Sequence, residues 1–195
     1  MSCRPGGVDY SRPVVALAVE LLGATVRHGA CLGRIVETEA YHDSEAACHA
    51  HVGLTPRTHV LFGPPGRAYV YRSYGIHALL NAVAEPEGVG AAVLIRALEP
   101  LEGIGEMHAR RRRDRLEDLC SGPGKLTQAL GIDLSENNTD LLEGPIRILP
   151  RKGPPREHVA GPRVGITKAA ELPWRFCERS RHVSKPWPPG LHRRH

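Results

Sequence analysis

The segment 34–41 constrains the fold most, because it combines a strand pattern with two carboxylates. Its β-branched and aromatic residues favour an extended chain, in which successive side chains point to opposite faces. Glu37, Glu39 and Tyr41 therefore share one face. The opposite face carries Val36, Thr38 and Ala40. If that second face packs on a core, the first presents two acids and a ring to the space in front of it. A half-exposed strand with solvated glutamates is the alternative.

The length and composition indicate one globular domain, or one domain with a tail. A chain of 195 residues with 41% hydrophobic and 24% charged residues can bury most of its apolar surface. No window approaches the roughly 18 apolar residues of a membrane span, and the N-terminus lacks an apolar signal core. We therefore expect an intracellular protein with no membrane partner. The net charge of +5 fits a polyanionic partner.

The five cysteines are widely spaced and form no Cys-x-x-Cys pair. This spacing indicates reduced thiols rather than a disulfide framework or a zinc ribbon.

The residue patterns predict three helices and a larger number of strands. The helices are expected at 11–23, with Ser11 near the N-cap, at 100–113, opened by Pro100, and at 121–131. The strands are expected at 24–27, 30–41, 67–74, 76–84, 91–98, 146–149 and 164–167, with a long loop at 42–66. From Arg179 onward the chain is basic and rich in proline, so we expect a mobile tail there.

Aromatic residues are concentrated in one part of the chain. Of nine, five lie in the segment 41–74, and they are Tyr41, Phe62, Tyr69, Tyr71 and Tyr74. The same segment contains His42, His49, His51 and His59. Tyrosine rings at a pocket wall can stack on a planar ligand, and a nucleobase is such a ligand for a basic protein. Tyrosines that only pack a sheet are the alternative.

Two further motifs allow other readings. Cys48, His49 and His51, together with His42, offer zinc ligands, although their spacing matches no structural zinc module. The segment 122–125 is glycine-rich and ends in a lysine, but Leu119 and Leu126 replace residues that a nucleotide-hydrolysing loop requires. A helix N-terminus with a lysine can still hold one backbone phosphate.

The arginine run 110–113, with Arg115, has two equally weighted readings. It can grip DNA, or it can be a solvated helix end that complements the helix dipole.

Several blocks of the sequence, in order from about residue 13 to 184, resemble the alkyladenine (3-methyladenine) DNA glycosylase family. The blocks are 34–41, 55–57, 62–66, 69–71, 74–81, 94–101, 119–126, 163–165 and 174–176. The resemblance implies an α+β fold: a single domain, residues 1–184, with a curved, mainly antiparallel sheet flanked by helices, followed by a tail at 185–195. It implies a bacterial protein in the cytoplasm, associated with the nucleoid.

The resemblance also implies an activity. A member of this family flips a damaged purine out of double-stranded DNA and hydrolyses its N-glycosidic bond, leaving an abasic site. The expected substrates are 3-methyladenine, 7-methylguanine and, as a further class, deaminated purines. The enzyme is expected to act as a monomer, without a metal or another cofactor and without a lyase step. A non-catalytic binder of damaged DNA is the competing reading, and the presence of Glu39 argues against it.

Position by position, the resemblance implies a role for particular residues. Glu39 corresponds to the general base that activates water, and Arg96 helps to hold the water and the substrate. The residues that meet the flipped base are Tyr41, Tyr71, His49 and, against the 2-amino group of guanine, Asn81. The residues that contact DNA are the wedge Tyr74 together with Arg57, His77 and Lys125. No role is implied for Glu37.

Overall fold

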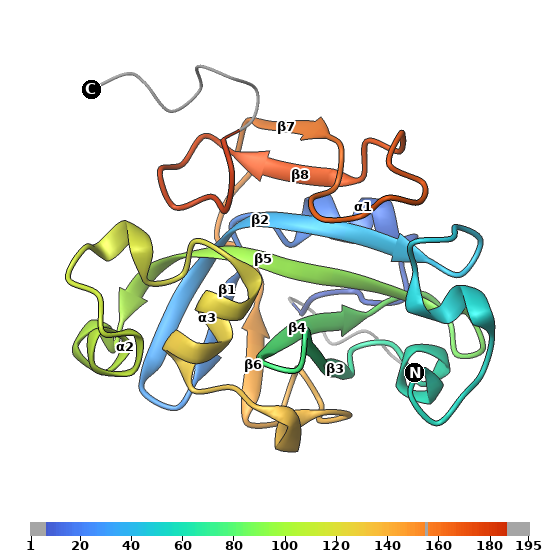
Figure 1. Ribbon diagram of the computed structural model, residues 1–195, viewed down its shortest axis with the longest axis horizontal. Coiled ribbons are helices and arrows are strands. Elements are labelled where there is room, and N and C mark those ends of the chain that lie inside the picture. Colours follow the sequence, from blue (N-terminus) through green and yellow to red (C-terminus); the bar gives the residue numbers. More distant parts are fainter. Residues whose placement is uncertain (1–6, 155, 187–195) are drawn as a thin grey trace.

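A curled antiparallel sheet organises the chain, and the computed structural model describes it for residues 7–154 and 156–186. The strand order is β3-β4-β5-β2-β1-β6, and β8 pairs with both β2 and β7 (Figure 1). The strands are β1 Thr25–His28, β2 Cys31–His42, β3 Ala68–Ser73, β4 His77–Val83, β5 Ala91–Glu102, β6 Ile146–Leu149, β7 His158–Gly161 and β8 Arg175–Glu178. The predicted α+β fold in a single domain is confirmed.

Within the described residues, three helices and four short 3-10 helices accompany the sheet. The helix α1 packs against β2 and β5, while α3 packs against β4, β5 and α2. The bounds are α1 Val14–Glu20, α2 Ile104–Arg111, α3 Pro123–Leu130, η1 His49–Val52, η2 His59–Phe62, η3 Leu116–Asp118 and η4 Leu134–Glu136. In the described ranges, no helix combines the length and the apolar character that crossing a membrane requires.

Most predicted elements are present, and the exceptions have local causes. The helix expected from Pro100 begins at Ile104, because β5 continues to Glu102 and a proline fits extended backbone as well as a first helical turn. The N-cap of α1 is Pro13 rather than Ser11. The segment 164–167 is not a strand, and two strands that were not predicted, β7 and β8, flank it in the chain.

A β-bulge at Val36 divides β2 into two halves. Ile35 pairs with Leu98 and Glu37 pairs with Ala97, which leaves Val36 without a partner on β5. The first half of β2 pairs with β1 and the second half with β8, so the bulge lies where the sheet bends. Val36 and Ala40 were predicted to share a face, and this prediction is wrong because of the extra residue. Val36 packs with Cys177 and Val183, whereas Ala40 belongs to the main core.

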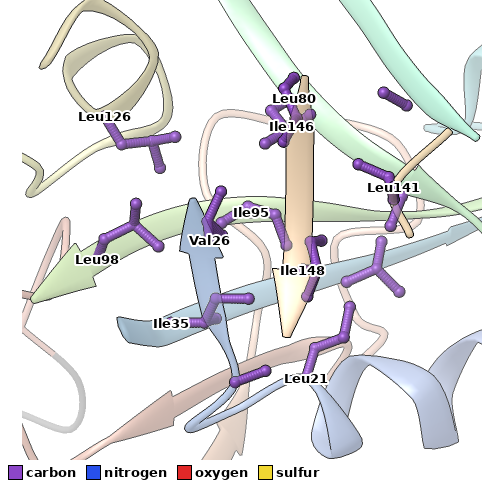
Figure 2. Packing of buried hydrophobic residues seen from close by; sticks show 14 of the residues in the cluster. Leu21, Val26, Ile35, Leu80, Ile95, Leu98, Leu126, Leu141, Ile146 and Ile148 are labelled. Carbon is purple, nitrogen blue, oxygen red and sulfur yellow. The ribbon is translucent and has the colours of Figure 1, made fainter. Parts of the chain in front are cut away.

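The main core lies between the sheet and the helices α1 and α3. Figure 2 shows side chains from β1, β2, β4, β5, β6 and α3 meeting there, with Leu21 from the residue after α1. A second, smaller cluster lies on the other face of β3, β4 and β5 and includes Tyr69 and Ala92, with Tyr41 and Tyr71 packed against it. This second face is the one that carries the candidate site.

The segment that follows β8 does not behave as the mobile tail that was predicted from Arg179. His182 and Val183 are buried. The backbone N–H of Ser184 donates to Glu37, and the carbonyl of Lys185 accepts from Arg175. The charged groups in the interior of the sheet therefore hold this segment in place. Residues 187–195 of the expected tail lie outside the described ranges.

Candidate active site

Alternate residues of the central strands form one wall of a cavity of about 490 Å³. Val93 and Ile95 of β5 point into the main core, so the period of two turns their neighbours to the other face. The cavity residues from β5, β4 and β3 are Ala92, Leu94, Arg96, Leu79, Asn81, Tyr69, Tyr71 and Ser73. The loop 42–66 and the segment after β7 close the cavity with Ala47, Cys48, His49, Leu61, Val164, Gly165 and Ile166.

The strand register places Glu39 beside this wall. Tyr69 pairs with Asn81, Asn81 with Leu94, and Leu94 with Glu39, which in turn pairs with Arg175. Residues in such a cross-strand row point to the same face of the sheet. The row therefore brings an aromatic ring, an amide and a carboxylate from separate strands to one side.

Glu39 is not itself a cavity-lining residue, and its carboxylate has no exposed area. Its Oε1 accepts from the N–H of Val164 at 2.7 Å, and its Oε2 accepts from the Tyr41 hydroxyl at 2.8 Å and from Arg96 Nη1 at 3.3 Å. All three donors belong to residues that line the cavity. The sequence indicated an acid facing open space; the structure instead covers that acid with its own donors.

Burial determines the acidity of this carboxylate. The loss of solvent raises the pKa of Glu39, and Arg96, the Val164 N–H and the Tyr41 hydroxyl oppose that rise without cancelling it. A carboxylate with a raised pKa is a stronger base than an exposed one. The pKa of Tyr41 is raised as well, by burial and then by the charge of Glu39. The tyrosine therefore stays protonated, and its hydroxyl donates a hydrogen bond to Glu39.

Glu37 lies on the same face as Glu39 but does not reach the cavity. It is fully buried and accepts from Arg96, Arg175 and Ser184. The alternative of solvated glutamates on a half-exposed strand is therefore wrong for both acids. Sequence spacing treated the two residues alike, but their hydrogen-bond partners differ. All three donors to Glu39 line the cavity, whereas Arg96 is the one donor to Glu37 among the cavity-lining residues.

Stacked aromatic rings on β3 form part of the cavity wall. The rings of Tyr69 and Tyr71 stack with centroids 5.3 Å apart, which confirms that these two tyrosines share a face. The His49 ring meets Tyr71 edge-on at 4.6 Å, and its Nδ1 lies 3.1 Å from the Tyr69 hydroxyl. Burial, and then the charge of Arg57, lower the pKa of His49, so its ring is neutral. This part of the cavity wall thus presents aromatic rings and a neutral imidazole.

Arg163 packs over the Tyr41 ring, and the sequence did not indicate this contact. Its guanidinium carbon lies 4.6 Å from the Tyr41 ring centroid and 5.4 Å from that of Trp174. Glu45 pairs with both terminal nitrogens of this buried arginine, at 2.6 and 3.0 Å. The arrangement fixes the plane of Tyr41 and leaves the ring lining the cavity.

Asn81 is buried in the floor of the cavity. Its Nδ2 donates to the backbone carbonyl of Tyr69 at 3.0 Å, which fixes the orientation of the amide. The side chain therefore restricts the space available to a ligand.

The hairpin between β3 and β4 carries the most exposed ring of the cavity. Tyr74 is 89% exposed, and its backbone has a φ of 48° in the left-handed region. His77, at the start of β4, and Lys125, in the first turn of α3, line the same cavity. Arg57 is not among the lining residues, but its guanidinium lies 5.7 Å from the Tyr71 ring centroid. Three of the four residues predicted to contact DNA thus line the cavity, and Arg57 contacts one of its rings.

The zinc reading is not supported by the geometry. Cys48 is buried and directs its thiol to the Gly90 carbonyl, whereas His51 bonds the Asp43 carbonyl and His42 bonds Ser44. Across residues 7–154 and 156–186, no three His, Cys, Asp or Glu side chains come together as a metal site.

The glycine-rich segment and one member of the arginine run line the same cavity. The segment 122–125 lies at the start of α3, and Arg111 lines the cavity beside it. Arg110 and Arg111 also stabilise the fold, because they donate to the carbonyls of Ala129 and Leu119. Arg112, Arg113 and Arg115 remain exposed. Neither reading of the run accounts for all of its members.

Comparison with known proteins assigns the chain to a family. Residues 8–182 match the family model for methylpurine-DNA glycosylase. A protein of Rhodopseudomonas palustris is 56% identical over 180 residues, 92% of this chain and 87% of that protein. Proteins of Rubrobacter xylanophilus and Methanoculleus marisnigri are 51% and 49% identical, over 86% and 90% of this chain and 90% and 96% of their own lengths. All three are named "Putative 3-methyladenine DNA glycosylase". The chain belongs to the methylpurine-DNA glycosylase family.

Proposed function

We propose that this protein is a DNA glycosylase that takes a methylated purine out of duplex DNA and hydrolyses its N-glycosidic bond with water activated by Glu39. One observation carries the proposal: a fully buried carboxylate lies directly behind the wall of an aromatic cavity, held by donors that line that wall. Family membership and the names of the relatives support the same reaction. One chain supplies all of these residues, so we propose that it acts as a monomer.

The cavity suits a flipped purine on energetic grounds. Extruding a base from the duplex costs a few kcal/mol, and stacking on an aromatic ring returns about 1–3 kcal/mol. Tyr41 and Tyr71 both line the cavity and offer such rings. An alkylated purine carries positive charge, so the faces of electron-rich tyrosines attract it further. A neutral His49 does not oppose that charge.

Glu39 can then serve the chemical step. The bond between base and sugar breaks toward an oxocarbenium-like sugar, and a nearby carboxylate stabilises that positive charge. The same carboxylate takes a proton from the attacking water. Arg96 and the Val164 backbone, which line the cavity and contact Glu39, are positioned to hold the water beside it. The products are the free base and an abasic site, with no strand cleavage.

Tyr74 is the proposed wedge that fills the space left in the duplex. Its exposed ring at the tip of a hairpin, beside His77 and Lys125 at the cavity mouth, supports this role. We propose that Arg57, His77 and Lys125 contact the DNA around the flipped nucleotide. The proposed substrates are 3-methyladenine, 7-methylguanine and deaminated purines, with Asn81 disfavouring bases that carry a 2-amino group.

The experiment is a product analysis with duplex DNA treated with a methylating agent. We expect the wild-type protein to release free methylpurines and to leave abasic sites, with the strands intact until they are treated with alkali. Strand cleavage without alkali would contradict the absence of a lyase step. Tight binding of the methylated duplex with no released base would show a non-catalytic binder instead, and the proposed hydrolysis would be wrong.

A further inference from the structure

We propose that Glu37 is a positioning residue: it holds the Arg96 guanidinium through Nε, so that Glu39 keeps a single long contact with that cation and stays basic enough to take a proton from water. The inference rests on the proposed function, because it concerns the same reaction.

The contacts of Glu37 are those of a fixed anchor. Its Oε1 accepts from Arg96 Nε at 3.0 Å, from Arg175 Nε at 2.8 Å and from the Ser184 hydroxyl at 2.7 Å. Its Oε2 accepts from the Ser184 N–H at 2.5 Å. Four donors from three separate segments converge on one carboxylate with no exposed area. A buried charge that is satisfied so completely has a fixed position.

This anchor divides the hydrogen-bonding capacity of Arg96. Nε binds Glu37, Nη2 donates to the Ser184 hydroxyl at 3.2 Å, and Nη1 donates to Glu39 at 3.3 Å. A guanidinium binds a carboxylate most strongly through two parallel N–H groups. Here Glu39 receives one of them, and that contact is the longest of its three hydrogen bonds. Glu37 therefore prevents a tight two-point pair between Arg96 and Glu39.

The charges around the two acids lead to the same conclusion. Arg96 on β5 and Arg175 on β8 face Glu37 and Glu39 on β2, so two cations balance two anions in the interior. Both arginines contact Glu37, whereas Glu39 shares one of them. The other groups that face Glu39 are the Tyr41 hydroxyl and the Val164 N–H. Nearby on β8, burial, and then the charge of Glu37, raise the pKa of the Cys177 thiol to about 12, so it stays neutral.

The direction of the effect on Glu39 follows from this arrangement. The negative charge of Glu37 adds to burial in raising the pKa of Glu39. Without that charge, Arg96 has Glu39 as its remaining carboxylate and moves toward a two-point pair with it. Such a pair favours the ionised form and lowers the pKa of the base.

The test is the pH profile of base release from methylated duplex DNA under single-turnover conditions. For Glu37→Gln we expect the acid limb of the profile to move to lower pH by about one unit, because an opposite charge at close range shifts a carboxyl by that order. Above the limb, release should be several-fold slower, because a weaker base assists the water less. A merely structural role of Glu37 changes the midpoint of thermal unfolding but leaves the limb in place.

Glu178→Gln is the matched control. Glu178, on β8, is also a buried acid that pairs with an arginine, Arg34. Among the described contacts, no hydrogen bond links it to Glu37, Glu39 or Arg96. Its loss should lower the unfolding temperature and leave the acid limb where the wild type has it. A shift in Glu178→Gln equal to that in Glu37→Gln would overturn the inference.

A charge-balanced variant keeps the test decisive if Glu37→Gln does not fold. The double variant Glu37→Gln, Arg175→Gln removes one anion and one cation. Arg175, which pairs with Glu37, is therefore not left as an unpaired buried cation. Freed from Glu37, Arg96 should again lower the acid limb. An unmoved or raised limb in either folded variant overturns the inference. Absence of base release by the wild type would instead refute the proposed function itself.

Discussion

The Tyr41 hydroxyl and the Tyr41 ring serve two different groups. The hydroxyl donates to Glu39, while the ring lines the cavity on one side and meets the buried guanidinium of Arg163. A single residue thus links the cavity to Glu39, the proposed base. Because the two contacts use different atoms, a substitution can remove one and keep the other.

Replacing Tyr41 with Phe should move the acid limb of base release to higher pH. The hydrogen bond from Tyr41 lowers the pKa of Glu39, so its loss allows burial to raise that pKa further. The base must be ionised to accept a proton, and a higher pKa requires a higher pH. In the wild type we expect the limb above the ordinary pKa of a glutamate, because burial raises the pKa of Glu39. The measurement is the single-turnover rate against pH.

Tyr69→Phe is the control for that change. It removes another hydroxyl of the same cavity, one that bonds His49 and has no contact with Glu39 among the described hydrogen bonds. Its acid limb should match the wild type. A limb that stays in place or moves down in Tyr41→Phe would contradict the assignment of the limb to Glu39.

Among the elements, the hairpin of β3 and β4 shows most clearly a compromise between stability and function. Ser73 pairs with His77, so the loop consists of the three residues between them. Its first residue, Tyr74, has a positive φ, which is unfavourable for a side chain of this size. The fold gains little from the ring, which is almost fully exposed. A strained residue that is not needed for packing indicates a role in binding.

Tyr74→Gly should separate these two contributions. Glycine adopts a positive φ without strain, so the free energy of unfolding should stay the same or rise by up to about 1 kcal/mol. Affinity for duplex DNA with a single lesion should fall by about tenfold or more, because the stacking ring is lost. Urea denaturation and fluorescence anisotropy measure the two quantities.

An exposed apolar residue far from the cavity provides the comparison. Leu142→Ser removes a half-exposed side chain that does not line the cavity, so lesion affinity should not change. Equal lesion affinity of Tyr74→Gly and the wild type would remove Tyr74 as the wedge.

Elements with a clear local signal were predicted from the sequence, and elements without one were not. The long apolar run at 91–98, after the turn-like residues 85–88, predicted β5, and Gly131 marked the end of α3. The strand β8 has only four residues, two of them charged, and all four are buried, so it shows no such run. Its partners on β2 lie more than a hundred residues earlier in the chain. Such long-range pairing determines the strand, and local sequence does not record it.

The candidate site was predicted in the same uneven way. Residues on the strands that the sequence predicted, such as Tyr71 and Asn81, line the cavity, and their roles stay predictions. The bulge at Val36 was invisible, because it depends on the register between two strands. Arg163 and Ser184 act on the site from segments that read as loop and tail. Their roles follow from packing rather than from any local pattern.

At the scale of the whole molecule, the segment after β8 completes the charged interior. The Ser184 N–H and hydroxyl donate to Glu37, and the Lys185 carbonyl accepts from Arg175. These contacts join the end of the described chain to β2 and to β8. They connect the stability of the fold to the geometry around Arg96.

Truncation should reveal that connection. A chain that ends at Arg181 loses the donors of Ser184, and we expect its free energy of unfolding to fall by about 3 kcal/mol, as when a buried charge loses a partner. A chain that ends at Pro186 retains every contact described for this segment and should be more stable than the shorter chain by that amount. Urea denaturation of the two truncated proteins provides the comparison. Equal stability of the two truncated chains would contradict the structural role of residues 182–185.

The rate of methylpurine release by wild type and Glu39→Gln tests the central claim most directly. Glutamine keeps the shape of the side chain but cannot accept a proton from water, so single-turnover release should fall by about 10²-fold or more. Binding of the lesion-bearing duplex should remain, because Glu39 lies behind the cavity surface. Equal rates in the two proteins would show that Glu39 is not the base that activates the water.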